Sequence, residues 1–151
     1  MSRPIPVDSW AWPVYLDTSA LVKLFVDEPE SDALNAELSA VGEVVLSDLA
    51  MTELASALAR HVREKVFTVA QARRLYGHAE RLVASCRFVE STPPVHRRAA
   101  RLLLTSTQVP LRTLDAIHIA LAIEADVATL VTFDPRLREA AASQGLYTAP
   151  S

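Results

Sequence analysis

Apolar residues recur along the chain with two periods, one typical of β-strands and one typical of α-helices. Short apolar runs predict strands at residues 14–16, 43–46, 87–90 and 128–133, and residues 146–148 are a candidate edge strand. Apolar positions three and four residues apart predict helices at residues 20–25, 31–38, 48–63, 68–83, 95–104, 114–123 and 135–142. Strands that alternate with helices indicate an α/β domain with a mostly parallel sheet. The two helices between the second and third strands are an insertion in this pattern.

The first predicted strand, Val14 to Leu16, ends directly on the carboxylate of Asp17. In parallel α/β sheets the carboxyl ends of the strands open onto the ligand crevice, which would place Asp17 in a site. Asp is also among the preferred N-cap residues, so the cap of the following helix explains Asp17 equally well. Asp134 raises the same choice, because it follows the strongest predicted strand and precedes Pro135, a residue favoured in the first helical turn.

Glu53 lies inside the predicted helix 48–63, with Ala50 and Ala57 as small neighbours on either side. These neighbours leave room for a group to approach the carboxylate. Because Glu is a good helix former, an ordinary surface position explains Glu53 as well.

Asp115 and His118 are the only polar residues from 114 to 123, a helix so apolar that it belongs in the interior. With Thr113 as the N-cap, the carboxylate of Asp115 would favour the helix dipole. A buried carboxylate is nevertheless costly unless it is paired, hydrogen-bonded or bound to a metal. For His118 the preferred interpretation is a core histidine with satisfied hydrogen bonds, although a ligand or base is the alternative.

The four acids share a predicted position, because each follows a strand or lies in the first turns of a helix: Asp17, Glu53, Asp115 and Asp134. All four are therefore expected at the same carboxyl edge of one sheet. Four carboxylates in one place repel each other without a counter-ion. Mg²⁺ or Mn²⁺, which prefer oxygen ligands, would supply that charge. Such ions activate water and stabilise the departing oxygen in phosphodiester cleavage, so the sequence predicts a metal-dependent nuclease site.

Length and composition fit one globular domain of 151 residues, of which 50% are hydrophobic and 22% charged. Residues 1–13 contain three prolines and no long apolar run, so they are predicted to be an N-terminal tail, not a secretory signal, before a domain at residues 14–148. No apolar run is long enough to span a membrane. The single cysteine, Cys86, cannot form an internal disulfide and fits a reducing compartment, so a cytoplasmic protein is expected.

The formal net charge of −3 argues against a general nucleic-acid coat protein. Without the four candidate acids, however, the chain has one more basic than acidic residue. The surface around the acidic site would then be slightly positive, which suits a nuclease. Arginines gather in three clusters that are able to contact phosphates, Arg60/Arg63, Arg73/Arg74/Arg81 and Arg97/Arg98/Arg101. For any single cluster, a solvated helix face is the favoured interpretation.

Four ordered blocks of residues carry a resemblance to a known family: Leu16-Asp17-Thr18-Ser19-Ala20-Leu21-Val22-Lys23, Ser47 with Glu53, Thr113-Leu114-Asp115-Ala116-Ile117-His118-Ile119-Ala120, and Thr132-Phe133-Asp134-Pro135-Arg136-Leu137. Together they resemble the PIN domain, and more narrowly the VapC-type toxins of bacterial type II toxin–antitoxin modules. The resemblance runs from about Val14 to Leu146. The tail of thirteen residues departs from it, since family members usually start just before the first strand.

The resemblance implies a three-layer α/β/α fold with a mostly parallel sheet, and a Mg²⁺- or Mn²⁺-dependent endoribonuclease activity. It implies that Asp17 and Asp115 are the principal metal ligands, that Glu53 and Asp134 complete the site directly or through water, and that Thr132 supports it. It also implies a homodimer and a small antitoxin whose segment occupies the toxin's groove, often with an Arg placed against the acids.

Two other classes of protein remain for comparison. A phosphoacceptor signalling domain would need paired acids near the first strand end and a lysine after a late strand, but Lys23 and Lys65 are the only lysines. A non-catalytic RNA- or partner-binding module could keep the PIN-like fold. Loss of catalysis should then have eroded at least one acid, whereas all four are present.

Overall fold

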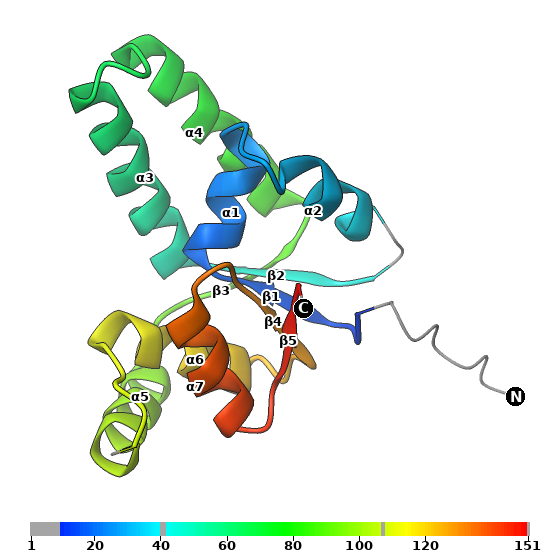
Figure 1. Cartoon of the computed structure of the whole chain (residues 1–151), viewed down its shortest axis with the longest axis vertical. Helices are drawn as coiled ribbons and strands as arrows, with labels where there is room; N and C mark the ends of the chain where they lie inside the picture. Colours follow the sequence, from blue (N-terminus) through cyan, green and yellow to red (C-terminus); the bar gives the residue numbers. More distant parts are fainter. Residues whose placement is uncertain (1–9, 40–41, 107, 151) are drawn as a thin grey trace, which may run out of the picture.

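The computed structural model describes residues 10–39, 42–106 and 108–150. Within them, five strands form a single sheet in the order β3-β2-β1-β4-β5 (Figure 1). The strands are β1 (Val14–Leu16), β2 (Val44–Ser47), β3 (Arg87–Val89), β4 (Thr129–Val131) and β5 (Tyr147–Ala149). Their pairings are all parallel, which confirms the prediction from the alternation of strands and helices.

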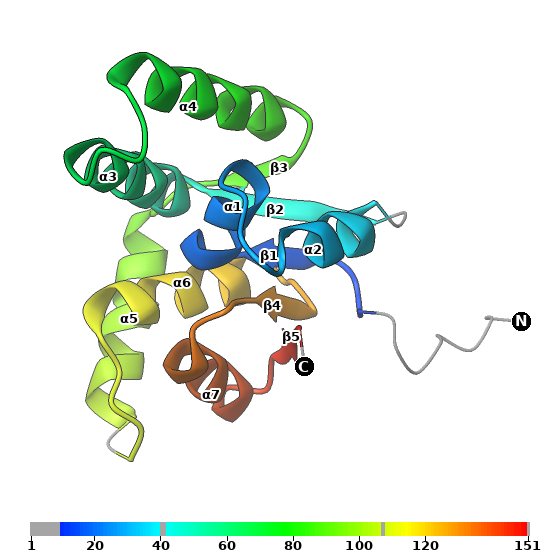
Figure 2. The same cartoon turned by 45° about the horizontal axis from the view of Figure 1, so that its top comes forward.

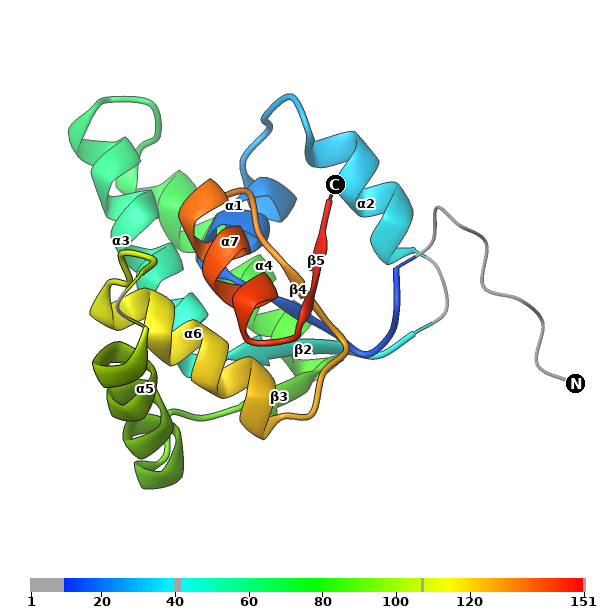
Figure 3. The same ribbon diagram turned by 60° about the horizontal axis from the view of Figure 1, so that its bottom comes forward.

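Helices cover both faces of this sheet. On one face lie α1 (Thr18–Phe25), α2 (Ser31–Leu38), α3 (Asp48–Arg63) and α4 (Val69–Ala84). On the other face lie α5 (Pro93–Thr105), α6 (Thr113–Glu124) and α7 (Pro135–Ser143), which Figure 3 shows from their own side. The arrangement is the predicted three-layer α/β/α fold.

The central strand β1 contributes to the core on both sides of the sheet. Val14 and Leu16 pack with the α1–α4 layer, whereas Tyr15 between them packs with the α5–α7 layer. Successive side chains of a strand point to opposite faces, so three consecutive apolar residues are needed where both faces are covered. All three side chains are fully buried.

The helix α6 is buried along most of its length, from Ala116 to Ala122. It packs against α5 and belongs to the same apolar cluster as Tyr15. The prediction of an interior helix is therefore confirmed. His118 is buried within this helix, whereas Asp115 in its first turn is only partly buried.

The long helices α3 and α4 are the predicted insertion between β2 and β3. They pack against each other, and Figure 2 shows that the pair extends beyond the sheet. The helix α3 therefore has an inner half beside the sheet and an outer half that lies away from it.

Residues 1–9 of the predicted tail lie outside the described residues. Trp10 and Trp12 are partly buried against the α1–α4 layer, so the described part of the tail packs onto the domain. The Trp12 ring lies so close to Gly42 that a Cβ atom at position 42 would come within 2.1 Å of it. A glycine is therefore required opposite this tryptophan.

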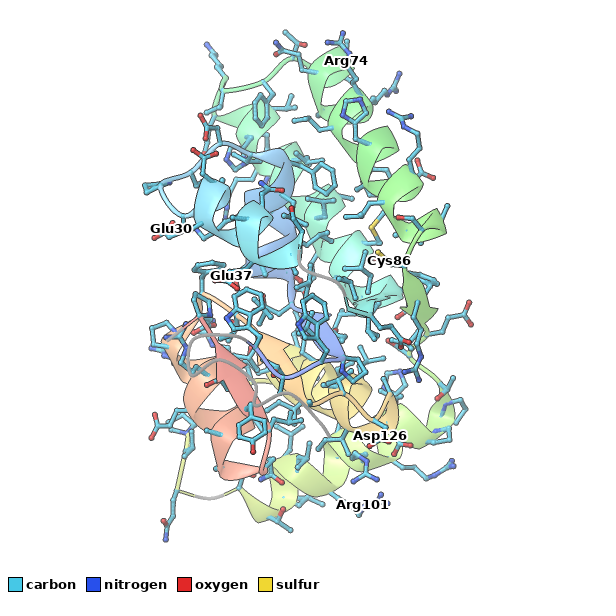
Figure 4. The ribbon with its side chains drawn as sticks, turned by 90° about the vertical axis from the view of Figure 1, so that its right-hand side faces the viewer. Glu30, Glu37, Arg74, Cys86, Arg101 and Asp126 are labelled. Atoms are coloured by element: carbon cyan, nitrogen blue, oxygen red, sulfur yellow. The ribbon has the colours of Figure 1, made fainter. Side chains whose placement is uncertain are left out.

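Among the described helices, none combines the length and the hydrophobicity needed to cross a membrane. Cys86 lies between α4 and β3 (Figure 4) and is half-buried against the α1–α4 layer.

Candidate active site at the carboxyl edge of the sheet

The carboxyl end of β1 lies at the switch point of the sheet. From β1 the chain passes through α1 and α2 to β2 on one side, while β4 lies on the other side. In open parallel sheets, ligands bind in the crevice at such a point. The residue that follows β1 there is Asp17.

Asp17 is held in place by hydroxyl and amide donors and is only 3% exposed. Its backbone N–H donates to the carbonyl of Val131 on β4, at 3.1 Å. Its carboxylate accepts from Ser19 Oγ at 2.7 Å, from the Ala20 N–H at 2.9 Å and from Thr132 Oγ1 at 2.5 Å. The bond from Ala20 makes Asp17 the N-cap of α1, so the cap predicted as an alternative is present together with the position at the sheet edge.

Burial raises the pKa of Asp17 above its ordinary value. The hydrogen bonds from Thr132, Ala20 and Ser19 favour the charged form but only partly offset this effect. For the Asp17 carboxyl the cost of burial thus outweighs the stabilisation that these hydrogen bonds give to its charged form.

Asp134 is connected to Asp17 through the hydroxyl of Thr132. Thr132 Oγ1 donates to Asp17 and accepts from the backbone N–H of Asp134 at 3.0 Å. The Asp134 carboxylate accepts from the N–H of Arg136 at 2.9 Å and caps α7. Here too the acid is a helix cap and a neighbour of the other acids at once.

Asp115 lies in the first turn of α6, which begins at Thr113 with Arg112 as its N-cap. The predicted cap at Thr113 is therefore displaced by one residue, and no side chain makes the capping bond. Burial raises the pKa of Asp115, and the charge of Asp134 raises it further. The two carboxylates are thus close enough to repel each other.

Glu53 comes from the inner half of α3 and meets His118 of α6. Its Oε1 atom accepts from Thr18 Oγ1 at 2.6 Å and lies 2.6 Å from His118 Nε2. Burial raises the pKa of Glu53, but the hydrogen bonds from His118 and Thr18 outweigh this and leave the pKa below its ordinary value. The side chain is 28% exposed, so it reaches solvent at one end.

His118 continues inward to Tyr15 and Ser47. Its Nδ1 atom lies 2.6 Å from the Tyr15 hydroxyl, which lies 2.8 Å from Ser47 Oγ. Ser47 in turn caps α3 by accepting from the Ala50 N–H. The prediction of a satisfied histidine is confirmed, but its partners belong to the candidate site.

Tyr15 and Ser47 were not predicted as site residues from the sequence. The available signal was a hydroxyl in an apolar central strand, since a buried Tyr O–H normally finds a hydrogen-bond partner. That signal indicates a partner but does not identify it.

The four predicted acids come to one edge of the sheet from β1, α3, α6 and the end of β4. Within the described ranges, however, no three His, Cys, Asp or Glu side chains are arranged so that they would hold a metal ion as they stand. The donors are nevertheless all carboxylate oxygens, which hard divalent cations prefer, and those of Asp17 and Glu53 accept hydrogen bonds from hydroxyl groups.

A pocket of ≈ 550 Å³ opens beside Glu53 and extends along α3. Thr18 and Glu53 line one part of it, and Arg60 and Arg63 of the outer half of α3 line another. Asp17, Asp115 and Asp134 do not line it. The pocket is therefore an open approach to the Glu53 side of the site.

The cations of this pocket differ in how they are paired. Lys23 forms ion pairs with Glu28 and, at 2.9 Å, with Glu30. Arg60 and Arg63 form no ion pair with any of the residues that the structure describes. Their charges are thus available to a ligand.

The other arginine clusters lie apart from one another. Figure 4 shows Arg74 near the outer end of α4 and Arg101 on α5 at the opposite end of the molecule. They do not form one basic surface.

Comparison with known proteins gives the family. Residues 14–143 match the PIN domain. The chain is 39% identical over 142 residues to Ribonuclease VapC46 of Mycobacterium tuberculosis, and the match covers 91% of this chain and 98% of the relative.

Solved structures share the fold. A crystal structure of Mycobacterium tuberculosis VapC20, described as a Sarcin-Ricin loop cleaving toxin, matches with a TM-score of 0.67 and 17% identity over 85% of this chain and 95% of that one. A toxin–antitoxin complex from Klebsiella pneumoniae contains a chain of the same fold, with a TM-score of 0.61 and 17% identity over 83% of this chain and 90% of that one. The protein therefore belongs to the PIN domain family and, within it, to the VapC group.

Proposed function

We propose that this protein is the toxin of a type II toxin–antitoxin pair and acts as a metal-dependent endoribonuclease. The observation that carries the proposal is the buried carboxylate of Asp17 at the switch point, joined through Thr132 to Asp134. Asp115 and Glu53 are brought to the same edge by α6 and α3. The relatives named as ribonucleases and toxins support the same activity.

The residues present fit Mg²⁺ or Mn²⁺ by their donor chemistry. Burial is the main cause of the raised pKa values of Asp17 and Asp115, and a divalent cation would favour their charged forms. Asp17 and Asp115 would be its principal ligands, with Glu53 and Asp134 completing the site directly or through water. When bound, such an ion polarises the phosphate and lowers the pKa of water. Because no three of the acids converge closely enough now, the side chains would have to draw together around it.

The protein's own groups would orient the RNA and the acids. Ser19, Thr132 and the N-terminus of α1 hold the Asp17 carboxylate in one position. Arg60 and Arg63 would bind backbone phosphates of the strand that enters the pocket beside Glu53. The overall reaction adds water across one P–O bond of the RNA.

The proposed substrate is single-stranded RNA, for example in a loop, because unstacked bases are accessible for sequence-selective binding. The proposed partners are a small antitoxin that blocks the site and a second copy of the chain. The toxin–antitoxin complex from Klebsiella pneumoniae supports the antitoxin, since a chain of that complex shares this fold.

Expression in a bacterial host without an antitoxin tests this function. The wild type is expected to arrest growth and fragment cellular RNA, whereas Asp17→Asn, which keeps the side-chain size and removes a ligand charge, is expected to permit growth. Asp126→Asn is the matched control, because Asp126 is exposed and its positive φ of 55° suits Asn. Growth arrest by Asp17→Asn as strong as that by the wild type would contradict the proposed site. Normal growth with well-folded wild type would favour the non-catalytic binding module.

A further inference from the structure

Two buried polar residues outside the four acids reach the candidate site through Glu53. His118 is 3% exposed and Tyr15 is fully buried, and both lie in the apolar cluster of the α5–α7 layer or beside it. Buried polar groups of this kind need hydrogen-bond partners, and an incomplete network would destabilise the core. Their partners form one chain of contacts that runs from Ser47 to Glu53.

When the His118 imidazole is neutral, the donors and acceptors in this chain of hydrogen bonds can be arranged in only one way. The ionised Glu53 carboxylate only accepts, so His118 Nε2 must donate to it. Nδ1 is then the acceptor, and the Tyr15 hydroxyl donates to it. The Tyr15 oxygen in turn accepts from the Ser47 hydroxyl, whose own oxygen accepts from the Ala50 N–H. Every member is satisfied.

These hydrogen bonds involve only one of the two carboxylate oxygens of Glu53. Oε1 receives both the bond from His118 and the bond from Thr18. Oε2 receives no hydrogen bond from any residue that the structure describes. The carboxylate is therefore held by one oxygen and presents the other.

We propose that Tyr15 and His118 are positioning residues that fix the orientation of Glu53, so that Oε2 is the oxygen offered to a metal ion or its bound water. This inference rests on the proposed function. Removal of a residue that hydrogen-bonds to a metal ligand typically lowers metal affinity or activity by about 10- to 100-fold.

Substitution of Tyr15 and His118 in the full chain, freed of any antitoxin, tests the proposal. Tyr15→Phe removes only the hydroxyl and is expected to weaken Mn²⁺ binding, measured by calorimetry, by about 10-fold. It is expected to lower kcat for RNA cleavage with little change in KM, since RNA contacts are not altered. Tyr147→Phe is the matched control, because Tyr147 is 70% exposed on β5. Wild-type Mn²⁺ affinity and kcat in Tyr15→Phe would overturn the proposal.

A pair of substitutions at His118 separates positioning from packing. His118→Gln places an amide N–H near the position of Nε2, whereas His118→Leu fills the space without a donor. The proposal predicts that His118→Gln retains more Mn²⁺ affinity than His118→Leu, whatever their relative stabilities. Equal Mn²⁺ affinity in the two variants would overturn the positioning proposal. The same comparison tests the proposal if Tyr15→Phe does not fold.

NMR of the metal-free protein gives a readout independent of activity. Long-range ¹⁵N–¹H correlations of His118 are expected to show a proton on Nε2, and a proton on Nδ1 alone would overturn the proposal.

The Glu53→Gln variant separates a failure of the proposed function from a failure of the positioning proposal. If Glu53→Gln keeps Mn²⁺ binding and cleavage, the proposed function has the wrong acids. If it loses both while Tyr15→Phe and His118→Leu keep them, only the positioning proposal fails.

Discussion

Thr132 connects two of the four candidate acids through a single hydroxyl group. It is fully buried, donates to Asp17 and accepts from the backbone N–H of Asp134. Both partners lose a hydrogen bond if this oxygen is removed, and the Asp17 carboxylate is too deeply buried to find water easily instead.

Thr132→Val removes the hydroxyl with little change in shape. The free energy of unfolding of the metal-free protein, measured in urea, is expected to fall by about 1–3 kcal/mol, because buried polar groups are left unpaired. Thr52→Val on the exposed face of α3 is the control and should change it by less than about 0.5 kcal/mol. Equal stability of Thr132→Val and wild type would mean that the hydroxyl does not support the acids.

His118 shows how far a single residue is predictable. The sequence indicates a buried histidine with satisfied hydrogen bonds, because it lies on an otherwise apolar helix. Its partners are 65 and 103 positions away in the chain, at Glu53 and Tyr15. No local pattern identifies such partners, since they meet only when α3, α6 and β1 pack together.

At the scale of elements, α3 joins the candidate site to the pocket. Its inner half carries Glu53, and its outer half carries Arg60 and Arg63 along the same pocket. Because a helix places residues three and four apart on one face, the sequence spacing of these three residues is compatible with one continuous track.

Arg60→Gln with Arg63→Gln tests this track. In the catalytically inactive Asp17→Asn background without metal, the double substitution should weaken RNA binding. It should also reduce the slope of log affinity against log salt by about 0.7 per lost phosphate contact. Binding is measured by fluorescence anisotropy at several salt concentrations. The control, Arg97→Gln with Arg101→Gln on exposed α5 positions, removes the same charge. An equal effect of both pairs would indicate a general charge effect and no specific track.

The positions of the elements were largely predictable, and their arrangement was less so. Apolar runs located the strands to within a few residues because both faces of the sheet are covered, and α6 was recognised by its lack of polar residues. The one-residue difference at the cap of α6 has a physical cause, since Thr113 makes no capping bond and begins the helix instead. The pocket beside Glu53 was not predictable, because it depends on how α1 and α3 pack.

At the scale of the whole molecule, the parallel sheet gathers residues that are far apart in the sequence. Asp17 and Asp134 follow neighbouring parallel strands, while α3 and α6 bring Glu53 and Asp115 to the same edge from opposite layers. The two helical layers bury the sheet between them. The fold therefore gathers the acids at the strand ends, and among the described residues a pocket along α3 gives an open approach to Glu53.

We propose that this edge of the sheet cleaves RNA with the help of a divalent cation. Cleavage of RNA by the purified protein, with Mn²⁺ or Mg²⁺ and with EDTA, tests it most directly beside Asp17→Asn, Asp115→Asn and the control Asp126→Asn. Cleavage is expected to require the metal. Each site variant is expected to lose at least about 100-fold in rate, since a metal contributes several kcal/mol to transition-state stabilisation. The control should keep full activity. Cleavage in EDTA, or equal cleavage by the wild type and both site variants, would contradict the account.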